Sequence, residues 1–460
     1  MENKEKPLKI IKQDVVLVKP SKPTPSSVLP LSTIDNRPEL NTLCQTIHIF
    51  QTPNNITQRD LVLKIKEAIS EALFYYYPLA GRLVKHADGK LRIHCRADGV
   101  PYVETTANCN LSSLHYLNGS DRENAKHLAF NSNAFENGYQ YPLGIKVTKF
   151  LCGGFAIGIA ASHAVFDGNG GSQFFKAIAE LVSGKSEPDV KPVWERERLN
   201  GSITEHPLQS PMDEASAAVS PYLPTTTLVH ECFKVDSKSI KRLKVSLTNE
   251  ISDNIDSLEG ESFTSFEALG AYVWRSRTRA LKLNSDGKTS LAIVVGLRRN
   301  HSLVPPLPEG YYGNAFVDPK VVLTVKELNE MPLSHVVKMI NEAKKLGFSR
   351  EYIKNHIDTT ETKTKTEQFD YQGIGASMVL SSWFYLGMLE NMDLGWAKPV
   401  NMVPAPRDVF GTVGLWIFTP PSDLDPSMNG GVRIFVSLPS DAMPKFKEEM
   451  EALKLVKPFS

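Results

Sequence analysis

The chain has 460 residues, of which 41% are hydrophobic and 22% are charged. This composition is typical of a globular protein, and the length predicts two or three domains with well-buried cores. The 52 basic and 51 acidic residues leave a formal net charge of +1. That balance excludes the strong field that steers proteins to nucleic acid or to anionic membranes.

The amino-terminal segment and the cysteines indicate a cytoplasmic protein. Residues 1–9 are charged and lead into no apolar stretch of the kind that a secretory signal requires. No apolar run reaches the length of a transmembrane helix. The five cysteines are odd in number and none forms a C-x-x-C pair, so we expect neither a disulfide framework nor a zinc site.

Strand patterns dominate the first half of the chain, with two helical segments between them. Residues 59–76 carry apolar positions at helical spacing, and the Pro and Gly of residues 78–81 end that helix. A second helical period begins after Asn169. The ranges predicted as strands are 9–19, 42–50, 91–95, 100–105, 144–152 and 154–161.

A segment rich in Pro, Ser and Ala, with weak periodicity, separates the two halves. We predict residues 1–190 as an amino-terminal domain, 191–228 as a crossover linker and 229–460 as a carboxyl-terminal domain. Because strands alternate with helices in both halves, we predict an α/β protein with two sheet-based domains. The polar stretch 361–367 is predicted as a mobile loop. The second half has predicted strands at 229–235, 291–297, 376–385, 413–419 and 431–437, and predicted helices at 237–246, 264–283, 332–347 and 441–454.

The run His163-Ala-Val-Phe-Asp167-Gly168 is the strongest candidate for chemistry. It lies where an apolar strand rich in small residues ends and a glycine-rich segment turns into a helix. Such a junction is rigid enough to aim an imidazole and open enough to meet a substrate. Imidazole is also the side chain best suited to proton transfer near neutral pH. A structural histidine at a strand end fits the same pattern, so the motif alone leaves both interpretations open.

Several unlinked segments in a consistent order give the chain a resemblance to the plant BAHD acyltransferases over roughly residues 9–455. His163-x-x-x-Asp167-Gly168 is similar to the first signature motif of that family, and Asp393-Leu-Gly-Trp-Ala397 is similar to the second. The resemblance implies two similar-sized domains with mixed sheets and flanking helices, a chloramphenicol acetyltransferase-like fold, and an active-site tunnel at the domain interface. The supporting segments are Leu31–Asp35, Tyr77–Arg82, Cys152–Phe155, Pro305–Asn314 and Ser381–Trp383.

The chain departs from the family pattern at two places. The second motif usually reads Asp-Phe-Gly-Trp-Gly, so Leu394 and Ala397 replace a phenylalanine and a glycine. Neither replacement removes a catalytic group. Gly296 stands where the family has an aspartate two positions before Arg298, so any pairing through that aspartate is absent.

The resemblance implies transfer of an acyl group from a coenzyme A thioester to an alcohol or amine, with no metal and no permanently bound cofactor. His163 is implied as the general base for the attacking atom. Ser381 and Trp383 are implied as donors to the oxyanion, although a packed core aromatic also explains Trp383.

No serine near His163 has a G-x-S-x-G elbow, which disfavours a hydrolase triad. Asp167 is expected to pair with Arg298 and to hold the domains in register. The other residues expected to serve structure at the site are Gly168, Asp393, Gly395 and Trp396.

The substrates are less defined than the reaction. Ser262 and Thr264, at a predicted helix start, are the candidates for coenzyme A contacts. Within the family the chain most resembles the spermidine hydroxycinnamoyl transferases, which implies a hydroxycinnamoyl or benzoyl donor and a polyamine acceptor. The alternative is O-acylation of an alkaloid alcohol, for example a tropane, or of a terpenoid alcohol with benzoyl-, cinnamoyl- or acetyl-coenzyme A. A non-catalytic homologue is the remaining interpretation. We expect a monomer that binds neither nucleic acid nor membrane.

Overall fold

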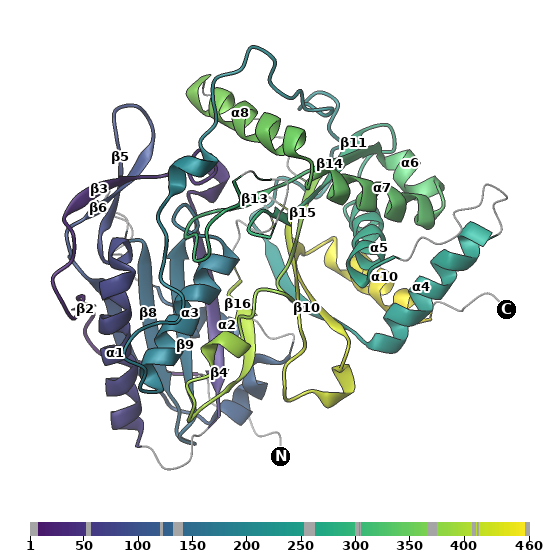
Figure 1. Cartoon of the computed structure of the whole chain (residues 1–460). Coiled ribbons are helices and arrows are strands. Elements are labelled where there is room, and N and C mark those ends of the chain that lie inside the picture. The colour runs from purple at the N-terminus through teal and green to yellow at the C-terminus, as the bar shows by residue number, and fades with distance from the viewer. Residues whose placement is uncertain are drawn as a thin grey trace, which may run out of the picture.

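Two β-sheets lie side by side, and helices pack on each of them (Figure 1). The computed structural model describes residues 8–51, 57–119, 123–131, 141–252, 263–299, 303, 305–366, 375–406, 411 and 414–455. Within these ranges, no helix combines the length and the apolar character needed to cross a bilayer.

The first sheet has seven strands and carries the His163 motif at the end of one of them. Strand β9 (Phe155–Ser162) is buried along its whole length, and its small side chains allow close cover on both faces. Helices α1 (Gln58–Tyr75) and α3 (Gly168–Val182) share an apolar core with one face. Helix α2 (Glu123–Leu128) covers part of the other face. The strand order is β1 (Ile10–Lys12), β7 (Val100–Ala107), β8 (Leu143–Lys149), β9, β4 (Leu43–Phe50) and β16 (Pro399–Pro404), with β2 (Val16–Val18) also paired to β7.

The second sheet has six strands and is also mixed, because β11, β15 and β17 run parallel while their outer neighbours are antiparallel. A capping box formed by Thr264 and Glu267 begins helix α5 (Ser265–Ala280). The strand order is β10 (Leu228–Val235), β18 (Val432–Pro439), β17 (Leu415–Thr419), β15 (Ser377–Ser382), β11 (Lys288–Ile293) and β14 (Lys320–Thr324). The α-helices with bounds in the described part of this half are α4 (Ser237–Ser252), α5, α6 (Val325–Glu330), α7 (Leu333–Leu346), α8 (Arg350–Thr366) and α10 (Met443–Leu455).

Two small sheets complete the described architecture. Strands β3 (Ser27–Pro30), β6 (Leu91–Cys95) and β5 (Arg82–Lys85) form one, and β12 (Val295–Gly296) pairs with β13 (Phe316–Val317) in the other.

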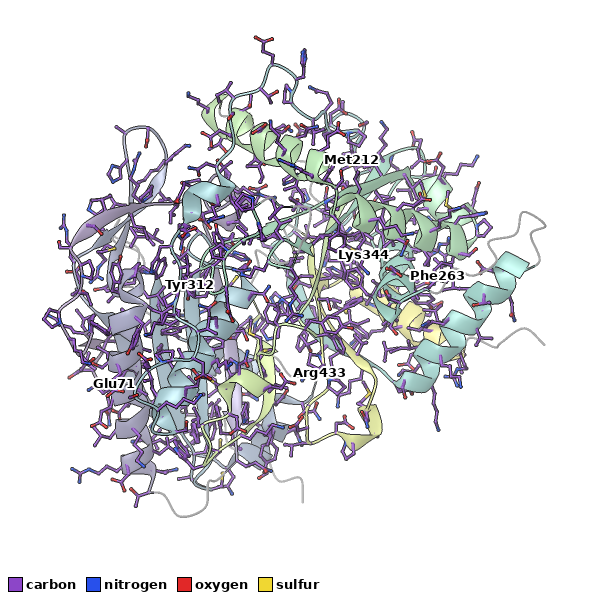
Figure 2. All side chains as sticks on the ribbon, viewed as in Figure 1. Glu71, Met212, Phe263, Tyr312, Lys344 and Arg433 are labelled. Atoms are coloured by element: carbon purple, nitrogen blue, oxygen red, sulfur yellow. The ribbon has the colours of Figure 1, made fainter. Side chains whose placement is uncertain are left out.

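The second half of the chain also builds part of the first sheet. Strand β16 pairs antiparallel with β4, so the segment after Trp383 crosses to the amino-terminal side. Tyr312 belongs to the second half of the chain, but it is fully buried in the core that α1 and α3 share, where Figure 2 labels it. In the opposite direction, Ile417 and Phe435 of the second sheet join the apolar cluster beneath the first sheet. Each sheet therefore shares its core with residues from the other half of the chain. The predicted linker at 191–228 separates the two halves along the sequence, but it does not separate their hydrophobic cores.

The prediction of a mobile loop at 361–367 is wrong for residues 361–366, which form the end of α8. Ile353 and Ile357 lie one turn apart and are buried, and the polar side chains that follow them find partners elsewhere in the fold. Residue 367 lies outside the described ranges. Tertiary contacts therefore stabilise a helix that its polar composition does not predict. Residues outside α8 that donate hydrogen bonds to its side chains include Thr33, Lys90, Ser202, Thr204 and Leu208.

The prediction of one strand over 9–19 is also wrong in detail. Strands β1 and β2 pair with opposite ends of β7 and are separated by residues 13–15. The interruption includes Gln13 and Asp14, and polar residues of this kind are tolerated because the segment lies at the exposed edge of the sheet.

Candidate active site

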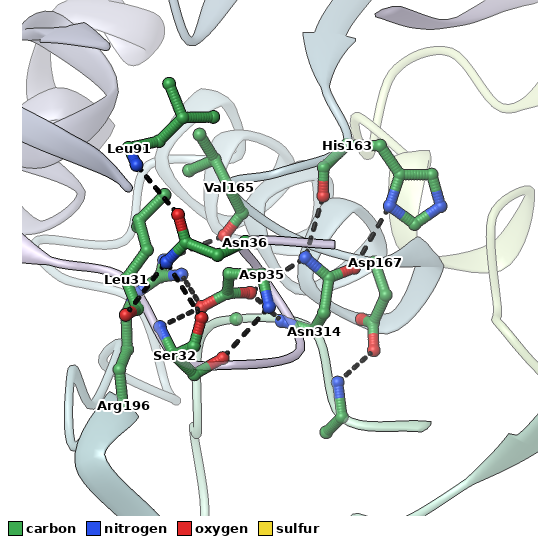
Figure 3. A network of polar contacts seen from close by, with 12 residues as sticks. Leu31, Ser32, Asp35, Asn36, Leu91, His163, Val165, Asp167, Arg196 and Asn314 are labelled. Atoms are coloured by element: carbon green, nitrogen blue, oxygen red, sulfur yellow. Dashed lines mark hydrogen bonds and ion pairs between the residues drawn. The ribbon is translucent and has the colours of Figure 1, made fainter. Parts of the chain in front are cut away.

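His163 directly follows β9, and a backbone hydrogen bond fixes its position. Its N–H donates to the carbonyl oxygen of Thr42 at 2.8 Å, so the end of β9 and the start of β4 hold it together. The Nδ1 atom of the imidazole lies 3.0 Å from Oδ1 of Asn314 (Figure 3). The base candidate is therefore held at both its backbone and its ring.

The orientation of the Asn314 amide decides which ring nitrogen carries the proton. The Nδ2 group of Asn314 donates to the carbonyl oxygen of His163 at 2.7 Å and to Oδ1 of Asp35 at 2.8 Å. Both of its hydrogens are used, which leaves Oδ1 of Asn314 as an acceptor toward the imidazole. Nδ1 of His163 therefore carries the hydrogen, and Nε2 keeps a free lone pair.

Burial lowers the pKa of His163 below its ordinary value. The nearby carboxylate of Asp167 and the bond to Asn314 act in the opposite direction, while the positive charge of Arg37 lowers the pKa further. The imidazole is therefore neutral at neutral pH, as a general base must be.

Asp167 caps a helix and does not orient the imidazole ring. Its Oδ1 accepts from the N–H of Gly170 in the first turn of α3. Its Oδ2 accepts from Arg298 Nη1 at 2.6 Å and from the N–H of Ala315 at 3.0 Å. Burial alone would raise the pKa of Asp167, but the charge of Arg298 and these hydrogen bonds outweigh it and lower the pKa. The geometry favours a carboxylate that ties the amino-terminal half to the carboxyl-terminal half.

Two glycines predicted for the site lie where a side chain would meet an obstacle or an unfavourable backbone. A Cβ atom on Gly168 would lie 2.5 Å from Cδ1 of Leu386, so the Leu386 side chain would have to move to make room for it. Gly395 has a φ of +78°, a conformation that favours glycine. Asp393 accepts a hydrogen bond from the Gly395 N–H at 2.9 Å, which closes the turn.

The two positions that depart from the family's second motif are part of the first core. Leu394 has no exposed surface, and Ala397 is 9% exposed. Trp396 packs against the same core, with its ring 6.2 Å from that of Phe155. The turn therefore anchors the chain just before it enters β16.

Ser381 and Trp383 come from the second sheet and its exit. Ser381 lies in β15, opposite Ile417 of β17. The backbone N–H of Trp383 donates to the carbonyl oxygen of Phe418 at 2.8 Å, and the indole packs against two apolar clusters that cover the faces of the first sheet. The Trp383 side chain thus extends from the exit of the second sheet to the first sheet.

A cavity of about 430 Å³ lies between α4 and the start of α5. Lys241 and Lys244 line it from α4, and Ser265 and Gly430 close its other side. Thr264, predicted to contact coenzyme A, is the N-cap of α5 and accepts from the Glu267 N–H, while Ser262 lies outside the described residues. The two lysines and the helix start could hold a phosphate. Within the described ranges, no three His, Cys, Asp or Glu side chains converge as metal ligands.

Asp35, Arg196 and Asn314 also belong to this site, although no pattern in the sequence marked them as functional. Asp35 and Asn314 lie in segments that resemble the family, and Arg196 lies in the predicted crossover linker. Only their proximity to His163 indicates a role.

Comparison with known proteins places the chain among acyltransferases. The model of the Transferase family matches residues 7–453. The spermidine coumaroyl-CoA acyltransferase of Arabidopsis thaliana is 42% identical and its spermidine sinapoyl-CoA acyltransferase 41% identical; the alignments cover 97% of this chain and 96% and 98% of theirs. The crystal structure of vinorine synthase superposes with a TM-score of 0.74 at 21% identity, over 97% of this chain and 98% of that one. This likeness confirms the predicted chloramphenicol acetyltransferase-like fold.

Proposed function

Because the chain belongs to the Transferase family, the BAHD acyltransferases, we propose that it transfers a hydroxycinnamoyl group from coenzyme A to a nitrogen of spermidine. The enzyme class is that of the acyl-CoA-dependent acyltransferases, and the acyl thioester is a co-substrate. The observation that carries the choice of acceptor is the identity of 42% and 41%, across 97% of the chain, to two acyltransferases named for spermidine.

In the proposed reaction an amine nitrogen attacks the thioester carbonyl while Nε2 of His163 removes its proton. The tetrahedral intermediate then collapses, the carbon–sulfur bond breaks, and the coenzyme A thiolate takes the proton back from the imidazolium. The free lone pair on Nε2 supports this role, because the opposite ring nitrogen is already bonded to Asn314. No acyl-enzyme is needed.

We assign oxyanion stabilisation to the Ser381 hydroxyl and the Trp383 indole N–H. Both groups can donate hydrogen bonds, and preorganised donors are the usual means of stabilising such an intermediate. Their location at the exit of β15 supports the assignment, since it allows them to approach the reacting carbonyl from the second sheet.

We place the phosphates of coenzyme A at the cavity between α4 and α5. The positive charges of Lys241 and Lys244 and the helix N-terminus at Ser265 support this placement. We also propose a cytoplasmic monomer. The odd number of cysteines and the lack of a C-x-x-C pair agree with a reducing compartment, and one chain supplies both the base and the proposed oxyanion donors.

The test is an acceptor panel with purified protein, coumaroyl-, benzoyl- and acetyl-coenzyme A, and a thiol reagent. We expect the highest kcat/KM with coumaroyl-coenzyme A and spermidine, and an amide product that resists mild alkali. Preference for an alkaloid or terpenoid alcohol would contradict the amine acceptor and support O-acylation. Absence of transfer with every pair would support a non-catalytic homologue.

The same assay tests the phosphate site. The double variant Lys241→Gln/Lys244→Gln should raise KM for the thioester and leave KM for spermidine unchanged. Lys345→Gln, on the exposed side of α7, is the matched control. An unchanged KM for the thioester would place the phosphates elsewhere.

A further inference from the structure

We propose that Asp35, clamped by Arg196, is the positioning residue that sets the tautomer of the catalytic base, and that it acts through the amide of Asn314. The inference rests on the proposed function, because it concerns His163 as the base. It assigns to Asp35 the orienting role that a triad would give to Asp167.

Asp35 is fully buried, and donors surround both of its carboxylate oxygens (Figure 3). Its Oδ1 accepts from the backbone N–H and from the Nδ2 group of Asn314, both at 2.8 Å. Its Oδ2 accepts from Arg196 Nη1 at 2.6 Å and from the Ser32 N–H at 3.0 Å. The carboxylate is thus fixed in one orientation, with one oxygen dedicated to Asn314.

Arg196 supplies the charge that allows a carboxylate to be buried there. It is 1% exposed and belongs to the crossover segment. One guanidinium nitrogen binds Asp35, and the other donates to the carbonyl oxygen of Val165 at 2.7 Å. Val165 lies between His163 and Asp167 in the motif loop. A single side chain therefore fixes both the orienting carboxylate and the loop that carries the base.

The clamp prevents rotation of the Asn314 amide. If the amide turned over, its oxygen would face the Asp35 carboxylate and the His163 carbonyl oxygen, two acceptors, and its NH₂ group would face the imidazole. That arrangement loses two hydrogen bonds and brings like partial charges together. With the amide fixed, Nδ1 of His163 stays protonated and Nε2 stays free. The Asp35 carboxylate thus orients the Asn314 amide, and the amide in turn orients the His163 imidazole.

Replacing Asp35 with asparagine should release the amide. Because Arg196 is charged, the oxygen of the new amide is expected to turn toward it, and its NH₂ group toward the N–H groups of Asn314. The Asn314 side chain then loses its acceptor and can present NH₂ to the imidazole. In that state Nε2 of His163 carries the hydrogen and cannot act as the base.

The direct test is the tautomer itself. Long-range ¹H–¹⁵N spectra of enzyme labelled with ¹⁵N-histidine, assigned with His163→Gln, should show a protonated Nδ1 and an unprotonated Nε2 at pH 8. Asp35→Asn should shift the population toward protonated Nε2. A wild-type ring protonated at Nε2, or an Asp35→Asn spectrum identical to wild type, would overturn the proposal. This measurement needs no acceptor, so it separates failure of the inference from failure of the proposed function.

The kinetic test uses Asp35→Asn, the volume-conserving Asn314→Leu, and their combination. We expect each single variant to lower kcat on the order of 10- to 100-fold, below the loss expected for removal of the base, with little change in KM for the thioester. The double variant should be no slower than Asn314→Leu, because Asp35 acts only through that amide.

The pH profile gives a readout that a purely structural role would not move. The charged groups that face His163 are Asp167 and Arg37, and neither is altered in these variants. The hydrogen bond between Asn314 and His163 raises the pKa of the imidazole. Loss of this bond should therefore lower that pKa and move the acid limb of the kcat/KM profile to lower pH. Asp358→Asn is the control: it removes a buried carboxylate charge that also holds the crossover segment, through Ser202, and should leave the limb in place. Additive losses, or a limb unmoved in both Asp35→Asn and Asn314→Leu, would contradict the proposal.

Discussion

At the residue scale, the proposed chemistry depends on one nitrogen atom of a buried imidazole. Replacing His163 with alanine should lower kcat by roughly 10²- to 10⁴-fold, the usual effect of losing a general base. Coenzyme A affinity, measured by calorimetry, should change little because the loss falls on the transition state. His335→Ala, an exposed histidine on α7, is the control. More than about a tenth of wild-type kcat in His163→Ala, against that range, would refute the assignment.

The pH dependence of kcat/KM tests the environment of the same ring. Burial lowers the pKa of His163 below the ordinary histidine value of about 6.5. The base works only when neutral, so activity should persist as pH falls through 7 and decline only below pH of about 6.5. The decline should disappear from what remains of the activity in His163→Ala. An acid limb above neutral pH would contradict a buried, neutral base.

At the scale of elements, the turn at residues 393–397 explains why the chain tolerates an atypical second motif. Leu394 is fully buried in the core beneath α1 and α3. Restoring the phenylalanine of the family pattern, Leu394→Phe, should destabilise the protein by about 1–3 kcal/mol through overpacking, as measured by denaturant unfolding. The exposed Leu455→Phe should change stability by no more than about 0.5 kcal/mol. A stabilised Leu394→Phe would show that the core has room for the larger ring.

At the scale of the whole molecule, the ion pair of Asp167 and Arg298 joins segments from the two halves. Its side chains are 9% and 19% exposed. Asp167→Asn and Arg298→Ala should each lower the free energy of unfolding by about 3 kcal/mol, because each leaves a largely buried partner uncompensated. The double variant should be no less stable than the worse single variant. A fully stable Asp167→Asn with a selective loss of kcat would instead indicate a triad-like role.

The division of the proposed catalytic groups between the two sheets has a kinetic consequence. His163 follows β9 of the first sheet, and Ser381 and Trp383 come from β15 of the second and its exit, so both substrates are expected to meet in a tunnel between the sheets. Enclosure there would protect the thioester from water. Initial-rate plots at several fixed spermidine concentrations should therefore give intersecting lines. Parallel lines, or labelled acyl group retained on denatured protein, would reveal a covalent intermediate.

Local pattern was sufficient for much of this protein. Helices α1 and α5 were predictable because their apolar residues recur at helical spacing and define their own buried face. Strand β9 was predictable as a short run of small apolar residues. His163 stood out as a candidate base because imidazole chemistry is a property of the residue itself. The fold class followed from the alternation of such elements, together with the segments that resemble one family.

Other features depended on partners far away in the chain. Strand β16 is short and has Pro399 and Pro404 at its ends, so it becomes a strand only where β4 offers it hydrogen bonds. The end of α8 is polar and becomes a helix because Glu361 and its neighbours find donors in other segments. Neither element carries a periodic apolar pattern that a sequence could display.

The contrast between what local sequence pattern shows and what distant contacts decide is clearest at the site. The sequence identified His163 and Asp167, but it could not tell which group orients the imidazole. That choice depends on Asp35, Arg196 and Asn314, which lie in three segments far apart along the chain; Asn314 is 151 residues from His163. Hydrogen bonds act over about 3 Å and carry no signature along the chain. Only folding, which brings these segments together, decides which nitrogen of the base is free.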